Sequence, residues 1–198
     1  MGENQSRKRR SELSRPGLAQ GGIVSAQLYS RIGIRHTACR RDYLSFSLAA
    51  QEIPHQLQPP ANEKLLLQVH ARGDQVYTCK SDSAQFTWAL KAPDAQLFDR
   101  NGKPFGKHFA GPSWQANDGS RATGQPAANL PSPDANSVPW LLVKVITHEG
   151  SGVLSRVTTI QRIHTKGGKA PASGCDASHL SQETRVPYEA DYRFFAPE

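Results

Sequence analysis

The sequence predicts an all-β protein, a single antiparallel sandwich or barrel of about nine short strands, preceded by a disordered N-terminal leader. Three observations lead to this prediction. From about residue 56 onward, short apolar or alternating runs follow one another. Asn-Gly, Asp-Gly and other glycine-containing turns separate these runs. No segment requires a helix, and without helical crossovers neighbouring strands pair in antiparallel fashion.

The strands are expected in a regular order along the chain, joined by tight turns. They occupy residues 64–71, 75–80, 85–93, two pieces of 95–109, the two arms of 113–124, 140–149, 152–165 and 188–197. Turns are expected at Gly73, at Asn101-Gly102, at Asp118-Gly119 and at Gly150-Ser151-Gly152. Residues 125–139 contain four prolines and no period, which predicts an exposed loop of the kind that often carries function.

Two strands show which of their faces are buried. Along 140–149, apolar residues occupy both faces, with Leu141, Val143 and Val145 on one and Trp140, Leu142 and Ile146 on the other. This pattern predicts a strand covered on both sides. The last strand alternates, so that Tyr188, Ala190, Tyr192 and Phe194 face the core.

The charge is concentrated in the leader. Residues 1–50 carry nine Lys and Arg against three acidic residues, whereas the rest of the chain carries fifteen against fourteen. The excess of positive charge therefore lies in the leader and not in the body. The body has no basic patch that would bind nucleic acid, and no nucleic-acid partner is expected. Residues 1–55 are predicted to be a disordered leader and residues 56–198 a single all-β domain.

The leader ends in a segment that looks like the end of an export signal. The run RRDYLSFSLAAQEIP, residues 40–54, has a charged pair, a short apolar run and small residues before a polar start. It indicates a remnant or mis-started export signal, and the protein is expected to be secreted or periplasmic. No stretch approaches the roughly 20 apolar residues of a membrane span.

Three cysteines are present, and two of them lie in the body. Cys39 belongs to the leader, which leaves Cys79 and Cys175 as an even pair. In an exported protein such a pair indicates a disulfide that closes a long loop and stabilises the fold by about 2–4 kcal/mol. The alternative is that both are free buried thiols.

One stretch combines residues that could bind a ligand. In GKHFAGPSWQANDGS, residues 106–120, Trp114 could stack on a sugar ring while His108 and Asp118 supply hydrogen bonds. Catalysis of polymer hydrolysis would need a second carboxylate near Asp118; the nearest acids in the sequence are Asp99 and Asp134, and spacing alone does not place them. The alternative is structural: the glycines make turns and Trp114 is a core residue.

The sequence lacks the motifs of metal sites, nucleophilic catalysis and phosphate binding. His70, His108, His148 and His164 show no metal-ligand spacing, so no metal site is expected. No catalytic residue is assigned, because no nucleophile elbow or phosphate-binding loop is present. No cofactor is expected.

Five segments of the body resemble domain-of-unknown-function family 3455. They are GDQVYTCK, GKHFAGPSWQANDGSRATG, VPWLLVKV, IQRIHTKGGKAP with the following GCD, and VPYEADYRFF, in this order within residues 62–196. The resemblance implies a small exported all-β protein of bacteria or fungi whose two cysteines are bridged. The family has no assigned role, so the resemblance implies nothing about chemistry.

These observations lead to two hypotheses about function. The first is a secreted, disulfide-stapled β-domain with a binding or structural surface role, whose partner is a carbohydrate or another cell-surface component. The second is an extracellular hydrolase that acts on a polysaccharide or other polymer, with Asp118 as its acid or base.

Overall fold

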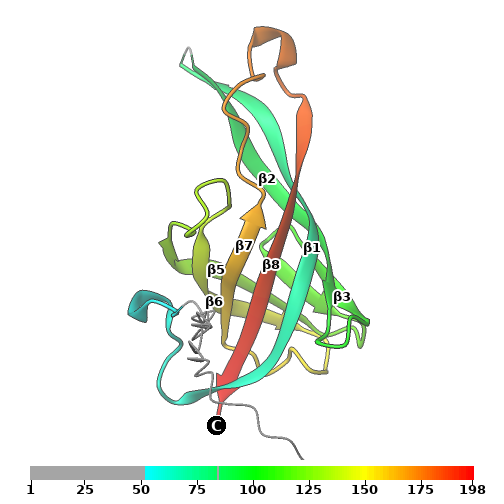
Figure 1. Ribbon diagram of the computed structural model, residues 1–198. Helices are drawn as coiled ribbons and strands as arrows, with labels where there is room; N and C mark the ends of the chain where they lie inside the picture. Colours follow the sequence, from blue (N-terminus) through cyan, green and yellow to red (C-terminus); the bar gives the residue numbers. More distant parts are fainter. Residues whose placement is uncertain (1–51, 84) are drawn as a thin grey trace, which may run out of the picture. The chain divides into compact units, whose positions relative to one another are not determined.

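Antiparallel strands curve into a closed barrel, in which each strand pairs with its neighbours along the chain and β8 returns to pair with β1 (Figure 1). The computed structural model describes residues 52–83 and 85–198. Within them the strands are β1 (Glu63–Asp82), β2 (Gln85–Phe98), β3 (Pro104–Phe109), β4 (Ser113–Ala116), β5 (Arg121–Leu130), β6 (Trp140–Glu149), β7 (Thr159–Gly167) and β8 (Glu183–Pro197). Two short 3-10 helices, η1 (His55–Leu57) and η2 (Ala177–His179), complete the described part. The predicted all-β, antiparallel fold is confirmed, as a barrel of eight strands rather than a sandwich.

The core fills the inside of the barrel. It is made by inward-facing apolar side chains that come from every strand except β3, among them Val69, Leu97, Trp114, Ala122, Val143, Ile160, Tyr192 and Phe194. The predicted inward face of the last strand is confirmed, since Tyr188, Ala190, Tyr192 and Phe194 all belong to this core. Each large side chain that is fully buried contributes about 1.5–3 kcal/mol to folding.

A second, smaller cluster covers part of the outer face of the barrel. Leu57 of η1 packs there with Trp140 and Ile163, and Leu142 adds to it. The start of β6 is therefore covered on both sides, as its sequence predicts, while Ile146 further along is exposed. Residues 1–51 of the predicted leader lie outside the described residues.

The predicted hairpin at Gly73 is wrong. Residues 63–82 form one continuous strand, which pairs with β2 on one side and with β8 on the other. Gly73 makes no turn; it allows the backbones of β1 and β2 to approach closely. A Cβ atom at this position would lie 2.2 Å from the carbonyl oxygen of Asp94 on β2. Three strands, β1, β2 and β8, are long rather than short, with 20, 14 and 15 residues.

Two loop boundaries also differ from the prediction. β5 continues through Pro126 to Leu130 with two register shifts, so the loop is 131–139 rather than 125–139, and its Ser137 and Val138 are buried rather than exposed. β7 begins at Thr159 rather than at residue 152, because residues 150–158 form a loop whose Leu154 and Val157 are buried against the barrel core. The predicted turns at Asn101-Gly102 and Asp118-Gly119 are confirmed, and both glycines have positive φ angles.

The end of β1, the start of β2 and the start of β8 extend beyond the barrel, at the end where β3 turns into β4 (Figure 1). The connection between β7 and β8, which carries η2, packs along this extension. Within residues 52–83 and 85–198, no helix combines the length and apolar character needed to cross a membrane.

Candidate functional site

Two of the three predicted site residues, His108 and Trp114, lie inside the barrel. They are register partners on the neighbouring strands β3 and β4, and their rings stack with centroids 4.4 Å apart and planes 10° from parallel. Trp114 is 1% exposed and His108 is 2% exposed. Trp114 therefore presents no face to solvent, and the geometry gives no support to its predicted stacking on a sugar ring.

His108 is held in one neutral form. Its Nδ1 lies 2.9 Å from the carbonyl oxygen of Ser113, which can only accept, so Nδ1 carries the hydrogen and Nε2 is left as an acceptor. Burial lowers the pKa of His108 to about 3, against the smaller opposing effect of this hydrogen bond. His108 is consequently uncharged at neutral pH.

Asp118 lies at the tip of the β4–β5 hairpin, which is the other end of the barrel from the β3–β4 turn. Its carboxylate accepts hydrogen bonds from the Ser120 hydroxyl at 2.6 Å, the Ser120 amide at 2.9 Å and the Val153 amide at 2.8 Å. The Ser120 hydroxyl contributes most to a lowered pKa of Asp118. Asp118 thus fastens the loop of residues 150–158 to the hairpin and does not join His108 and Trp114 in one site.

A cavity of about 470 Å³ lies at the end of the barrel near the β3–β4 turn. We call it the mouth cavity. Its lining residues come from six strands and this turn: Gln75, Leu90, Lys91, Ala92, Pro93, His108, Ala110, Gly111, Pro112, Pro126, Leu141 and Arg162. A space that six strands of one barrel border lies on the barrel axis, and its volume is typical of small-molecule sites.

Arg162 on β7 places a charge at this cavity. It shares the inward face of its strand with Ile160 and is 9% exposed. Its Nε and Nη2 donate to the backbone carbonyl oxygen of Pro139 at 3.1 and 2.8 Å. No aspartate or glutamate among the described residues forms an ion pair with Arg162. The guanidinium charge is therefore buried without a counter-ion from these residues.

Gln75 on β1 contributes a second unused donor. Its side chain is 1% exposed, and its Nε2 atom is buried without a hydrogen-bond partner. A buried donor left unpaired costs about 1–3 kcal/mol, so an amide in this state marks a place where a partner is missing. Gln75 and Arg162 line the same cavity.

Three phenols surround these donors and supply no negative charge. Burial raises the pKa of Tyr77, Tyr188 and Tyr192, while the positive charge of Arg162 acts on each of them in the opposite direction. The Tyr77 hydroxyl donates to the Gly168 carbonyl oxygen at 2.6 Å. All three are neutral at physiological pH, so they do not offset the charge of Arg162.

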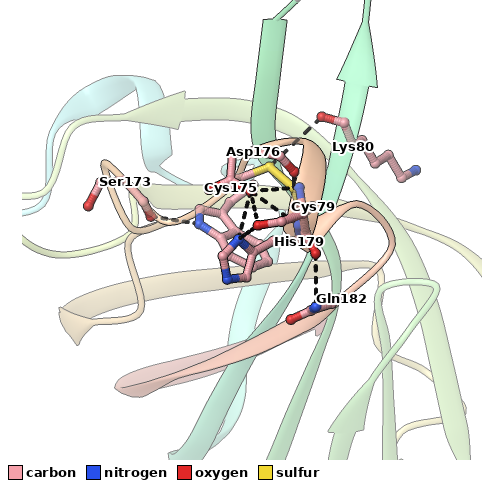
Figure 2. A network of polar contacts seen from close by, with 9 residues as sticks. Cys79, Lys80, Ser173, Cys175, Asp176, His179 and Gln182 are labelled. Atoms are coloured by element: carbon pink, nitrogen blue, oxygen red, sulfur yellow. Dashed lines mark hydrogen bonds and ion pairs between the residues drawn. A yellow bond between two sulfur atoms is a disulfide. The ribbon is translucent and has the colours of Figure 1, made fainter.

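A disulfide joins Cys79 on β1 to Cys175 in the β7–β8 connection, as Figure 2 shows. The backbone around it is also paired: the Cys79 amide donates to the Gln182 carbonyl at 2.9 Å, and the Cys79 carbonyl accepts from the Ser181 amide at 2.9 Å. Asp176 caps η2 by accepting from the Ser178 and His179 amides. The disulfide expected from the sequence is present in the structure, and it ties this connection to the extension beyond the barrel.

Two of the histidines considered as metal ligands meet on the outer surface. His70 and His164 each place Nδ1 about 3 Å from a different oxygen of Asp191, at 3.0 and 2.9 Å. Within the described part of the chain, no group of three or more His, Cys, Asp or Glu side chains is arranged to hold a metal ion.

The geometry defines a class of protein: a closed antiparallel β-barrel with a positively charged cavity at its mouth and a disulfide beside it. The chain belongs to the family described as Protein of unknown function (DUF3455), whose model matches residues 59–196. This match confirms the resemblance found in the sequence and covers the barrel from just before β1 almost to the end of β8. Neither the curated proteins nor the solved structures gave a match to the chain.

Proposed function

We propose that this protein is an exported binding protein that holds a small organic ligand in the mouth cavity and does not catalyse a reaction. One observation carries the proposal: a cavity of ligand size contains a buried, uncompensated guanidinium and a buried amide without a partner. Protein interiors satisfy such groups in nearly all cases, so donors that face an open cavity indicate a bound partner.

The lining of the cavity favours binding over catalysis. Its polar side chains are Gln75, Lys91, His108 and Arg162, and no Ser, Cys, Asp or Glu is found among the described residues that line it. His108 could act as a base through Nε2, but a pKa of about 3 makes it a weak base at neutral pH. The cavity therefore holds groups that orient a ligand and lacks a nucleophile.

Export is supported by the disulfide between Cys79 and Cys175. Structural disulfides persist in oxidising compartments such as the periplasm and the extracellular space, and they are rare in the cytosol. A secreted or periplasmic location is the one at which this cross-link would be stable.

A polymer hydrolase and a carbohydrate partner remain predictions from the sequence. The described contacts do not favour them, since Asp118 is engaged by Ser120 and Val153 and Trp114 is buried.

A neutral fluorescent dye tests the proposal. N-phenyl-1-naphthylamine emits more strongly in an apolar site, and we expect the full-length protein to bind it saturably with one site per chain. Ala110→Trp places an indole at the rim of the cavity from an exposed turn, so this variant is expected to lose dye binding with its fold intact.

Lys103→Trp is the matched control, because residue 103 is exposed in the β2–β3 turn at the other end of the barrel. It should bind the dye as the unsubstituted protein does. Binding that is equally strong in the Ala110→Trp variant would place the dye elsewhere and refute the proposal, as would the absence of binding by the unsubstituted protein.

A further inference from the structure

The mouth cavity contains one positive charge that the protein does not neutralise. Lys91 also lines the cavity, but its ammonium group forms an ion pair with Glu183 and is half exposed. The described hydrogen-bond partners of the Arg162 guanidinium are the Pro139 carbonyl and the Tyr192 hydroxyl, and both are uncharged. Because a buried charge without a counter-ion is costly, the ligand that suits this site brings a single negative charge.

The unused donors fit a planar anion. A guanidinium has five N–H donors, and Arg162 uses two of them on Pro139. The Gln75 Nε2 group lies near the neutral Tyr188 hydroxyl but makes no well-formed hydrogen bond, so its hydrogens remain available to a ligand. A carboxylate has two oxygens in the geometry that a guanidinium fork recognises, whereas a dianionic phosphate would bring one charge more than the site neutralises.

The rest of the cavity is apolar. Leu90, Ala92 and Pro93 from β2, the β3–β4 turn residues Ala110 and Pro112, Pro126 from β5 and Leu141 from β6 make up most of its lining. A ligand that fills this volume therefore joins its charged group to a hydrocarbon body.

We propose that the ligand is a monocarboxylate with an apolar acyl or aryl body, whose carboxylate binds Arg162 and the Gln75 amide while the body lies against the β2 and β3–β4 side of the cavity. This inference rests on the proposed function, because it names the ligand class for the same cavity. It assigns Arg162 and Gln75 as the residues that determine specificity.

The test compares octanoate with octan-1-ol, two probes of equal chain length that differ in the head group. Each is titrated into the full-length protein carrying N-phenyl-1-naphthylamine, and octanoate binding is also measured directly by calorimetry. A charge-assisted hydrogen-bonded pair favours octanoate over octan-1-ol by about 10- to 100-fold. Arg162→Gln keeps a donor for Pro139 but removes the charge, and it should reduce this preference to about 1.

Gln75→Glu provides the second variant, since it places a carboxylate of nearly the same shape in the cavity that Arg162 also lines. This internal carboxylate takes the place of the ligand's, so the preference for octanoate should disappear or reverse. Arg193→Gln is the matched control: Arg193 lies on the outward face of β8, away from the cavity, and its substitution should leave the preference unchanged.

The outcomes separate the two proposals. Equal displacement by octanoate and octan-1-ol, or a preference that survives both Arg162→Gln and Gln75→Glu, would overturn the carboxylate assignment and leave the binding function standing. If neither the dye nor octanoate binds, the proposed function fails and the assignment fails with it. Tighter binding of octyl phosphate than of octanoate would replace the monocarboxylate with a dianion.

Discussion

Replacing Cys79 and Cys175 together by alanine removes the cross-link between β1 and the β7–β8 connection. The two residues are 96 positions apart, so the bridge closes a long loop. In the chain-entropy model, closing a loop of this length lowers the entropy of the unfolded chain and so raises the free energy of unfolding by about 4.7 kcal/mol. A domain of this size unfolds with an entropy of about 0.3 kcal/mol per kelvin, so the double variant should melt about 15 °C lower than the native protein.

Thermal unfolding followed by circular dichroism measures this difference, with both proteins kept free of reductant. Cys39→Ser is the control for losing a cysteine without losing the bridge, and its melting temperature should be unchanged. Adding a thiol reductant to the native protein should reproduce the effect of the double variant. A decrease of less than about 3 °C in the double variant would refute the reasoning, because the closed loop would then contribute little to the unfolded-state entropy.

Three further perturbations test the fold. Gly73→Ala forces a Cβ atom against a backbone carbonyl of β2 at 2.2 Å, so we expect a lower melting temperature; an unchanged value would show that the two strands separate freely there. Asp118 has a lowered pKa, so it contributes stability that is present above the unfolded-state pKa of about 3.9 and is lost as the pH falls through the folded-state value. Urea unfolding of Asp118→Asn should therefore depend less on pH below about 5 than that of the native protein, and equal slopes would contradict this. Deleting residues 1–50 should leave the melting temperature unchanged, whereas deleting residues 1–58 removes the buried Leu57 and should lower it; a decrease on the shorter deletion would place the domain boundary earlier.

The strand faces were predictable because alternation is a local property of the sequence. Tyr188, Ala190, Tyr192 and Phe194 repeat with period two, and any sheet that buries one face places them together. Barrel closure was not predictable in this way, because it depends on β1 pairing with β8 across most of the chain. The role of Gly73 was not predictable for the same reason. In the sequence, a glycine that a neighbouring strand requires looks the same as a glycine in a turn.

The proposed ligand site could not be predicted from clusters of residues close together in the sequence. Arg162 and Gln75 lie on strands at opposite ends of the domain sequence, and only the closed barrel brings them to one cavity. The sequence did hold a signal: Arg162 is in phase with Ile160, and Gln75 is in phase with Val69 and Ala71, all inward-facing. A polar residue in the phase of the core is the pattern that would have identified both.

The stretch of residues 106–120 borders the cavity through His108 and the β3–β4 turn, and not through ligand stacking on Trp114. An eight-stranded barrel is just wide enough for side chains to fill it, so a ligand can enter only where the inward positions are small or polar. Trp114 fills the interior and stacks on His108, which in turn lines the cavity. Above this pair, Ala110 and Gly111 leave space that larger residues would occupy. The aromatic pair therefore closes the floor of the cavity, and the small residues of the turn keep its mouth open.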